Sequence, residues 1–166
     1  IRKITLKDIH DYQTLLNEPL VHENSTGLPN PVTTDFVLQR LSAREEREAS
    51  HQDIFQRGAY LHGELIGVGS IFVIGKNIWE LSYFIGRNYQ NNGFATALVE
   101  NLIVLTQKLG AKPTIIGRHK CGNAPSRRVL EKLGFEPCHK NLEGPSRNTH
   151  DTKILVMSLK GVDRMA

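Results

Sequence analysis

Alternating apolar and polar positions in the first half of the chain predict several β-strands rich in β-branched and aromatic residues. The expected strands are Arg2–Leu6, Ile54–Leu61, Glu64–Ile74 and Ile78–Ile85. Turns at His62-Gly63 and Gly75-Lys76-Asn77 would make the last three of them antiparallel neighbours. Because glycine weakens a strand, we expect Gly67, Gly69 and Gly75 to mark bulges or close backbone approaches.

Apolar residues spaced three and four apart predict helices around these strands. The expected helices are Lys7–Leu16, Phe36–Ser50 and Phe94–Gly110, followed by one with Pro125 in its first turn and Gly134 at its end. Thr33-Thr34-Asp35 would cap the second helix, whose charged run Arg44–Glu48 is expected to face solvent. The buried face of the third helix is expected to consist of Phe94, Leu98, Leu102, Leu105 and Leu109.

The remaining segments complete an α+β pattern. Glu18–Thr34 contains prolines and a glycine and is expected to be mostly loop. A fifth strand is expected at Pro113–Arg118, and Phe135–Cys138 would form a final hairpin with Thr152–Leu159 across the polar loop His139–Asp151. The chain of 166 residues is therefore predicted to form one domain, 1–160, with a short tail, 161–166. Its sheet would be mixed and mostly antiparallel, with six to seven strands, and about four helices would flank it.

The loop Gln90-Asn91-Asn92-Gly93-Phe94-Ala95-Thr96 joins the strand Ile78–Ile85 to the long helix. At such a helix start, several backbone N–H groups lack intrahelical acceptors, and the helix dipole favours an anion. Gly93 permits a turn or a close approach to a ligand, and Ala95 keeps the first turn uncrowded. The loop alone fits either a phosphate site or an ordinary strand-to-helix turn, and the second is the commoner case.

A second stretch, Asn123 to Phe135, favours the phosphate site. It opens with Asn123-x-x-Ser126 and ends with Val-Leu-Glu-Lys-Leu-Gly-Phe. Together with Gln90-x-x-Gly93-x-Ala95, it resembles the GCN5-related N-acetyltransferase (GNAT) superfamily, whose acetyl-CoA loop reads Arg/Gln-x-x-Gly-x-Gly/Ala. The second stretch looks closest to the ribosomal-protein N-acetyltransferase (RimJ/RimL-like) branch, as does the opening of the chain. The resemblance covers nearly the whole chain.

The resemblance implies an acetyl-CoA site, with the pantetheine in a gap between the splayed fourth and fifth strands. The backbone of Phe84 and Ile85 would hold the pantetheine, and backbone N–H groups would polarise the thioester carbonyl. Asn123 would bind the cofactor, cap its helix, or both. The residues implied to bind the cofactor are Phe84, Ile85, Gln90, Asn91, Asn92, Gly93, Phe94, Ala95, Thr96, Asn123, Ser126 and Arg128.

Acetyl transfer to an amine requires that the amine lose a proton and that hydrogen-bond donors meet the developing oxyanion. An acid can also assist the leaving thiolate. Many GNAT proteins protonate the thiolate with a tyrosine in the second-motif helix, but this chain has Leu130 there. The branch resemblance implies Ser126 near the sulfur instead, and the alternative is a helix-capping serine. It also places Glu80 near the acceptor amine as a candidate base, and the alternative is an exposed strand carboxylate.

Composition and residue spacing limit the kinds of partner that the sequence predicts. No apolar run approaches the ~20 residues needed to cross a bilayer, and the first residues show no signal-peptide pattern. Two cysteines are too few for a disulfide framework and fit a reducing cytoplasm, and the seven histidines show no zinc-site spacing, so no metal is predicted. The net charge of +4 permits an anionic partner, but no long basic stripe with aromatics favours nucleic acid. The basic cluster Arg118–Lys120, Arg127, Arg128 and Lys132 is either a solvated surface or a contact for the CoA 3′-phosphate.

The resemblance implies an N-acetyltransferase that moves an acetyl group from acetyl-CoA to a primary amine by direct attack in a ternary complex. The acceptor is a protein N-terminal α-amine or a small-molecule amine, and the protein is a monomer or homodimer. A non-catalytic acyl-CoA sensor on the same fold is the alternative, because the tyrosine is missing and Asn91, Asn92 and Phe94 are neutral. A nucleotide-binding domain is disfavoured, since neither Gly-x-Gly-x-x-Gly nor Gly-Lys-Ser/Thr occurs.

Overall fold

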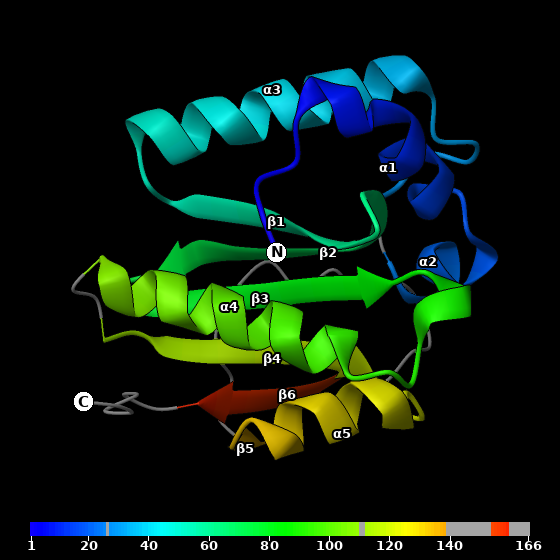
Figure 1. Ribbon diagram of the computed structural model, residues 1–166. Coiled ribbons are helices and arrows are strands. Elements are labelled where there is room, and N and C mark those ends of the chain that lie inside the picture. The colour runs from blue at the N-terminus through cyan, green and yellow to red at the C-terminus, as the bar shows by residue number, and fades with distance from the viewer. Residues whose placement is uncertain (26, 110–111, 139–153, 160–166) are drawn as a thin grey trace.

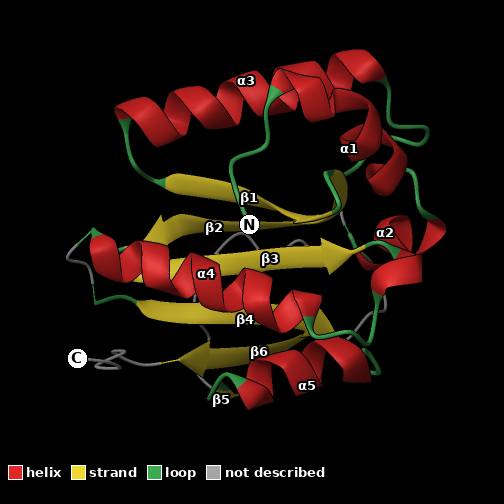
Figure 2. Ribbon diagram, viewed as in Figure 1, coloured by secondary structure: helices red, strands yellow, loops and turns green. Residues whose placement is uncertain are grey.

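The computed structural model describes residues 1–25, 27–109, 112–138 and 154–159. In this part of the chain, one sheet is covered by helices on both faces (Figures 1 and 2). The strands are β1 (Ile54–Leu61), β2 (Glu64–Gly75), β3 (Ile78–Ile85), β4 (Thr114–Lys120), β5 (Glu136–Pro137) and β6 (Ile154–Leu159). The helices are α1 (Ile9–Leu16), α2 (Pro19–Asn24), α3 (Thr34–Ser50), α4 (Phe94–Lys108) and α5 (Ala124–Lys132), with 3₁₀ turns η1 (Leu6–Asp8) and η2 (Arg87–Tyr89).

The order of the strands in the sheet is β1-β2-β3-β4-β6-β5. β3 and β4 run parallel, and the other neighbouring pairs run antiparallel. The predicted α+β fold with a mixed, mostly antiparallel sheet is therefore confirmed, including the three antiparallel strands before the central loop. The expected helix end at Gly110, the loop His139–Asp151 and the tail 161–166 lie outside the described residues.

The expected first strand, Arg2–Leu6, is wrong. Arg2 alone joins the sheet, through a single bridge to Gly58. The Asp8 carboxylate draws the next residues into a turn, because it accepts hydrogen bonds from Thr5 N and Oγ, both at 2.8 Å, and from the Arg2 guanidinium. Burial would raise the pKa of the Asp8 carboxyl, but these hydrogen bonds outweigh it and lower the pKa to about 2. A short-range polar contact thus overrides the strand pattern.

Two helix predictions also need correction. The segment Glu18–Thr34, expected to be mostly loop, begins with α2, whose first turn contains Pro19, where a missing N–H costs nothing. The buried face of α4 includes Leu98 and Leu102 as expected, but Leu109 follows the last helical residue and is 41% exposed. The other buried residues of α4 are Val99, Ile103 and Thr106.

The second expected helix is present as α3, and Thr33 caps it by accepting a hydrogen bond from Phe36 N at 3.2 Å. Its charged run does not lie wholly in solvent, as was expected. Glu48 is half-buried and pairs with Arg57 at 3.0 Å, and Arg44 is half-buried and donates to Ser70 Oγ. Charged residues of α3 therefore help to attach it to the sheet.

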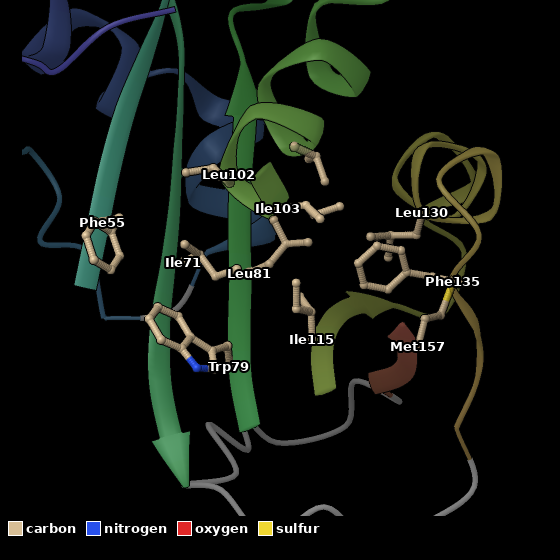
Figure 3. Close-up of a cluster of buried hydrophobic side chains, with 11 residues drawn as sticks. Phe55, Ile71, Trp79, Leu81, Leu102, Ile103, Ile115, Leu130, Phe135 and Met157 are labelled. Carbon is tan, nitrogen blue, oxygen red and sulfur yellow. The ribbon is translucent and has the colours of Figure 1, made fainter. Parts of the chain in front are cut away.

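Three clusters of buried apolar side chains hold the two layers of helices to the sheet. The largest joins β1 to β4 and β6 with α4 and α5, and Figure 3 shows Leu130, Phe135 and Met157 at one end of it. The second packs α1, α2 and α3 on the opposite face of β2, around Leu65 and Val68. The third lies beside the start of α4. The sheet is thus buried on both faces over β1 and β2.

The three glycines of β2 behave as the sequence predicts. A β-carbon at position 67 would lie 2.9 Å from the backbone oxygen of Phe84 and against Ile85 Cδ1. One at position 69 would lie 2.8 Å from Leu102 Cδ1, and Gly75 stands at a register shift against β3. Gly67 therefore sets how closely β2 and the end of β3 can approach.

We expect Gly67→Ala to lower the free energy of unfolding by about 1–3 kcal/mol, because backbone atoms of β3 occupy the space of the new methyl group. Gly75→Ala in the same strand is the matched control, since its β-carbon would lie 4.0 Å from the nearest atom, Ile78 Cδ1. Its effect should stay within about 1 kcal/mol. Urea unfolding of both variants measures the difference, and equal losses would contradict the close approach at Gly67.

Candidate active site

The central feature of the candidate site is a gap between the parallel strands β3 and β4. Their ladder pairs only Ile78–Leu81 with Thr114–Gly117, although β3 continues to Ile85 and β4 to Lys120. Beyond Leu81, β3 remains paired with β2, while β4 remains paired with β6. The predicted splay between the fourth and fifth expected strands is thus present, and it leaves facing backbone edges without strand partners.

Three helix ends gather at the open end of this gap. The end of α2, the start of α4 and the start of α5 lie near the carboxyl ends of β3 and β4 (Figure 1). Lys120 Nζ donates to the backbone oxygen of Glu23, and Asn123 Nδ2 donates to Asn24 Oδ1 at 3.2 Å. These bonds attach α2, an element that the sequence did not predict, to the start of α5.

The loop between β3 and α4 is held by its own side chains. Gln90 Nε2 donates to the backbone oxygen of Ile85 at 3.1 Å, and Asn92 Nδ2 donates to that of Gln90 at 3.0 Å. Asn91 and Gly93 adopt positive φ angles of 64° and 81°. Because Gly93 is the N-cap of α4 and has no side chain, it cannot accept from the first-turn N–H groups. The loop therefore offers an anion backbone donors.

Several predicted cofactor residues use their side chains for packing. Phe84 packs against the cluster beneath α1 and α3, and Phe94 and Ala95 pack against the cluster beside the start of α4. Ile85 is buried and Thr96 half-buried. These positions can meet a ligand in the gap chiefly through their backbone, as was expected for Phe84 and Ile85.

The first turn of α5 carries Asn123 and Ser126. Asn123 Oδ1 accepts a hydrogen bond from Ser126 N at 3.1 Å, so Asn123 caps the helix. Ser126 is half-buried, and its Oγ lies 3.0 Å from the hydroxyl oxygen of Tyr83. Arg128 is exposed on the same helix. The structure thus brings Asn123 and Ser126 together beside the gap.

Tyr83 is a residue of this site that the sequence did not single out. It lies on β3 beyond the end of the ladder with β4, and its hydroxyl also donates to the backbone oxygen of Ser126 at 3.1 Å. Burial raises the pKa of the Tyr83 hydroxyl to about 12, although the hydrogen bond with Ser126 lowers it. The only sequence signal was its place near the end of a strand that leads into the glycine loop.

Leu130 occupies the position where many GNAT proteins have a tyrosine, and it belongs to the core. Its side chain is completely buried and lies 2.9 Å from where a β-carbon of Gly117 would be (Figure 3). No proton donor is available at this position, and the packing shows why a leucine fits there.

Glu80 lies on the face of β3 opposite to Tyr83, because side chains alternate along a strand. It is half-buried, and its Oε2 accepts a hydrogen bond from Arg118 Nε of β4 at 3.2 Å. Glu80 is therefore not the exposed carboxylate of the alternative interpretation. Arg44 reaches the same sheet face from α3, at Ser70, which pairs with Ser82. This sheet face therefore carries two guanidinium groups, Arg118 at Glu80 and Arg44 at Ser70.

The basic cluster of the sequence divides into separate groups. Arg118 pairs with Glu80, Lys120 bonds to the end of α2, and Arg127 pairs with Glu131 at 2.7 Å. His119 is buried. Part of the cluster therefore stabilises the fold, and Arg128 and Lys132 remain exposed on α5.

In the part of the chain that the structure describes, no helix is long and apolar enough to cross a membrane. No group of three or more His, Cys, Asp or Glu side chains lies close enough to hold a metal ion there.

Comparison with known proteins identifies the family. The model of the acetyltransferase (GNAT) domain matches residues 1–136, most of the chain, so this protein belongs to the GNAT acetyltransferase family. The sequence prediction of GNAT membership is confirmed. Among curated proteins, no sequence matches the chain.

Solved structures share the fold at low sequence identity. A ribosomal-protein-S5-alanine acetyltransferase from Vibrio fischeri has a TM-score of 0.81 at 20% identity, covering 98% of this chain and 92% of that one. Mycobacterium smegmatis RimJ in complex with CoA-disulfide has a TM-score of 0.76 at 20% identity, covering 96% and 80%. The microcin C7 self-immunity acetyltransferase MccE, in complex with acetyl-CoA and AMP, has a TM-score of 0.79 at 14% identity, covering 94% and 88%.

We expect Leu130→Tyr to lower the free energy of unfolding by about 1–3 kcal/mol, because the fully buried position beside Gly117 has no space for the larger aromatic side chain. Leu130→Met, which conserves volume, is the matched control and should cost less than about 1.5 kcal/mol. Denaturant unfolding of both variants checks this. If the tyrosine variant were as stable as the methionine variant, the position would be open enough to hold a catalytic side chain.

Proposed function

We propose that this protein transfers the acetyl group of acetyl-CoA to a primary amine by direct attack in a ternary complex. The observation that carries the proposal is the gap between β3 and β4, with Ser126 beside it and the uncapped start of α4 at its end. The family of the chain supports the same reaction.

The residues of the gap fit acetyl-CoA part by part. The backbone N–H groups from Gly93 to Thr96 would bind the pyrophosphate, with the dipole of α4 favouring its charge. The free edge of β3 from Ser82 to Ile85 would bind the pantetheine by backbone hydrogen bonds. Arg128, which is exposed on α5, would meet the 3′-phosphate. Structures of the same fold named above contain CoA or acetyl-CoA, which supports this placement.

When bound, acetyl-CoA supplies a thioester: the amine lone pair forms the new C–N bond, the C–S bond breaks, and CoA leaves as a thiolate. Glu80 is the candidate base for the amine proton, directly or through water. Its half-buried carboxylate lies on the face of β3 opposite to Tyr83, the face over which the amine would approach. Ser126 is the candidate hydrogen-bond donor to the thiolate. Glu80 and Ser126 would then act from opposite sides of β3.

The acceptor amine would approach over the sheet face that carries Glu80 and Ser82. This face continues toward a groove between α3 and β1, lined by Phe36, Arg40, Arg44 and Ile54. Either a protein N-terminus or a small amine fits this description. Similar structures include an acetyltransferase named for a ribosomal protein and one named for self-immunity to a microcin, and the proposal includes both classes of acceptor.

Calorimetric titration with acetyl-CoA tests the cofactor site, with CoA, NADH and ATP for comparison. We expect acetyl-CoA to bind with a micromolar dissociation constant and NADH and ATP to bind weakly. Gly93→Ala should weaken acetyl-CoA binding by roughly tenfold or more, because a side chain at φ 81° strains the helix start. Gly63→Ala is the matched control, since its φ is 91° and it lies in the hairpin between β1 and β2. No binding of acetyl-CoA would refute the proposal.

A screen of amines and N-terminal peptides, followed by thiol release, then tests turnover. Thiol release that depends on an amine would establish the transferase. If acetyl-CoA binds but no amine causes thiol release, the alternative function, an acyl-CoA sensor on the same fold, would be left.

We expect Glu80→Gln to lower the rate and to flatten the low-pH limb of the rate profile, because the amide cannot accept the amine proton. Glu100→Gln, an exposed change on α4, is the control and should leave the profile unchanged. The measurement is kcat against pH with saturating acceptor. An unaltered low-pH limb in Glu80→Gln would exclude this residue as the base.

A further inference from the structure

A pair of hydroxyl groups bridges one side of the gap. Tyr83 comes from β3 and Ser126 from the first turn of α5, and their hydroxyl oxygens lie 3.0 Å apart. The Tyr83 hydroxyl lies 3.1 Å from the backbone oxygen of Ser126 as well. The pair is located where β3 and β4 have separated, so it stands beside the space assigned to the pantetheine.

Each hydroxyl has one proton, so the pair has two arrangements. If Tyr83 donates to the backbone oxygen of Ser126, the serine proton is free to point back to Tyr83 Oη. If Tyr83 donates to Ser126 Oγ, the serine proton cannot point back to Tyr83 Oη and is available to a group in the gap. A thiolate in the gap would favour the second arrangement, because both hydroxyl protons then lie along one chain of hydrogen bonds directed to the sulfur.

We infer that Tyr83 is a positioning residue, which directs the Ser126 hydroxyl toward the leaving thiolate and replaces the function lost at Leu130. This inference rests on the proposed function. With a thiolate in the gap, Tyr83 donates to Ser126 Oγ instead of to the backbone oxygen, and Ser126 Oγ donates to the sulfur, so the thiolate is stabilised at the end of a chain of two hydrogen bonds. No covalent bond and no proton transfer beyond those of acetyl transfer is involved.

The surroundings of Tyr83 support a neutral donor. Its side chain is half-buried and packs against the apolar cluster beside the start of α4. Burial raises the pKa of this hydroxyl to about 12, so it keeps its proton over the working range of the enzyme. A hydroxyl that stays neutral can donate at every such pH, which suits a hydrogen bond to a thiolate better than the delivery of a proton.

The first test uses bound CoA and needs no acceptor amine. The thiol of CoA is titrated on the protein by the ultraviolet absorbance of its thiolate, with CoA lacking the sulfur as the blank. In the wild type we expect the bound thiol to have a lower pKa than free CoA, because the hydrogen-bond chain favours the thiolate. In Tyr83→Phe and in Ser126→Ala it should return toward the value of free CoA. Tyr60→Phe, on β1, is the matched control and should behave as the wild type.

The second test uses the coupling between the two residues in turnover. Ser126→Ala and Tyr83→Phe should each lower kcat, by roughly 10- to 100-fold for the serine, with little change in the KM for acetyl-CoA. Because Tyr83 acts through Ser126, Tyr83→Phe should have no further effect on kcat in the Ser126→Ala background. A purely structural role would lower both backgrounds by the same factor.

The outcomes separate this inference from the proposed function. A wild-type enzyme that binds CoA and acetylates amines, with a bound-thiol pKa that Tyr83→Phe leaves unchanged, overturns the role of Tyr83 alone. Failure of acetyl-CoA to bind the wild type overturns both. If Tyr83→Phe does not fold, 3-fluorotyrosine at this position, a stronger donor of similar size, should lower the bound-thiol pKa further, and no change would again overturn the inference.

Discussion

The structure depends on a short ladder of backbone hydrogen bonds between β3 and β4. Four residue pairs join two halves of the sheet, β1-β2-β3 and β4-β6-β5, and beyond them each strand keeps only its outer partner. Packing sustains this divergence from both sides. On one side Gly67 lets β2 hold the end of β3 closely, and on the other Leu130 fits against Gly117 of β4. The packing of the protein itself therefore shapes the gap.

The side chains around the gap are distributed by the alternation along β3. Tyr83 points to the helix layer of α4 and α5, where it meets Ser126, whereas Glu80 points to the opposite face and meets Arg118. A ligand in the gap would thus have hydroxyl donors on one side and a carboxylate on the other. This separation suits a reaction in which one group leaves as an anion and the other arrives as an amine.

Much of the fold could be predicted from the sequence, because strands β1 to β3, helices α3 and α4 and the loop at Gly93 each show a local pattern. The failures have physical causes that a single pattern does not reveal. Asp8 turned an alternating segment away from the sheet, and α2 is too short to show a helical period. In the candidate site, the glycine loop and the Asn-x-x-Ser motif could be recognised from the sequence, but Tyr83 was missed because a tyrosine on a strand is usually a core residue. Its role depends on Ser126, which is 43 positions away.

Because the ladder is interrupted, a bound pantetheine would lie between β3 and β4 like an additional strand. Its amides would satisfy backbone groups that protein strands satisfy elsewhere in the sheet, so the cofactor would become part of the secondary structure. Loading the protein would then slow hydrogen exchange along the inner edges of β3 and β4 and raise the stability of the whole sheet. The co-substrate of the reaction would thus supply backbone hydrogen bonds that the protein's own sheet lacks.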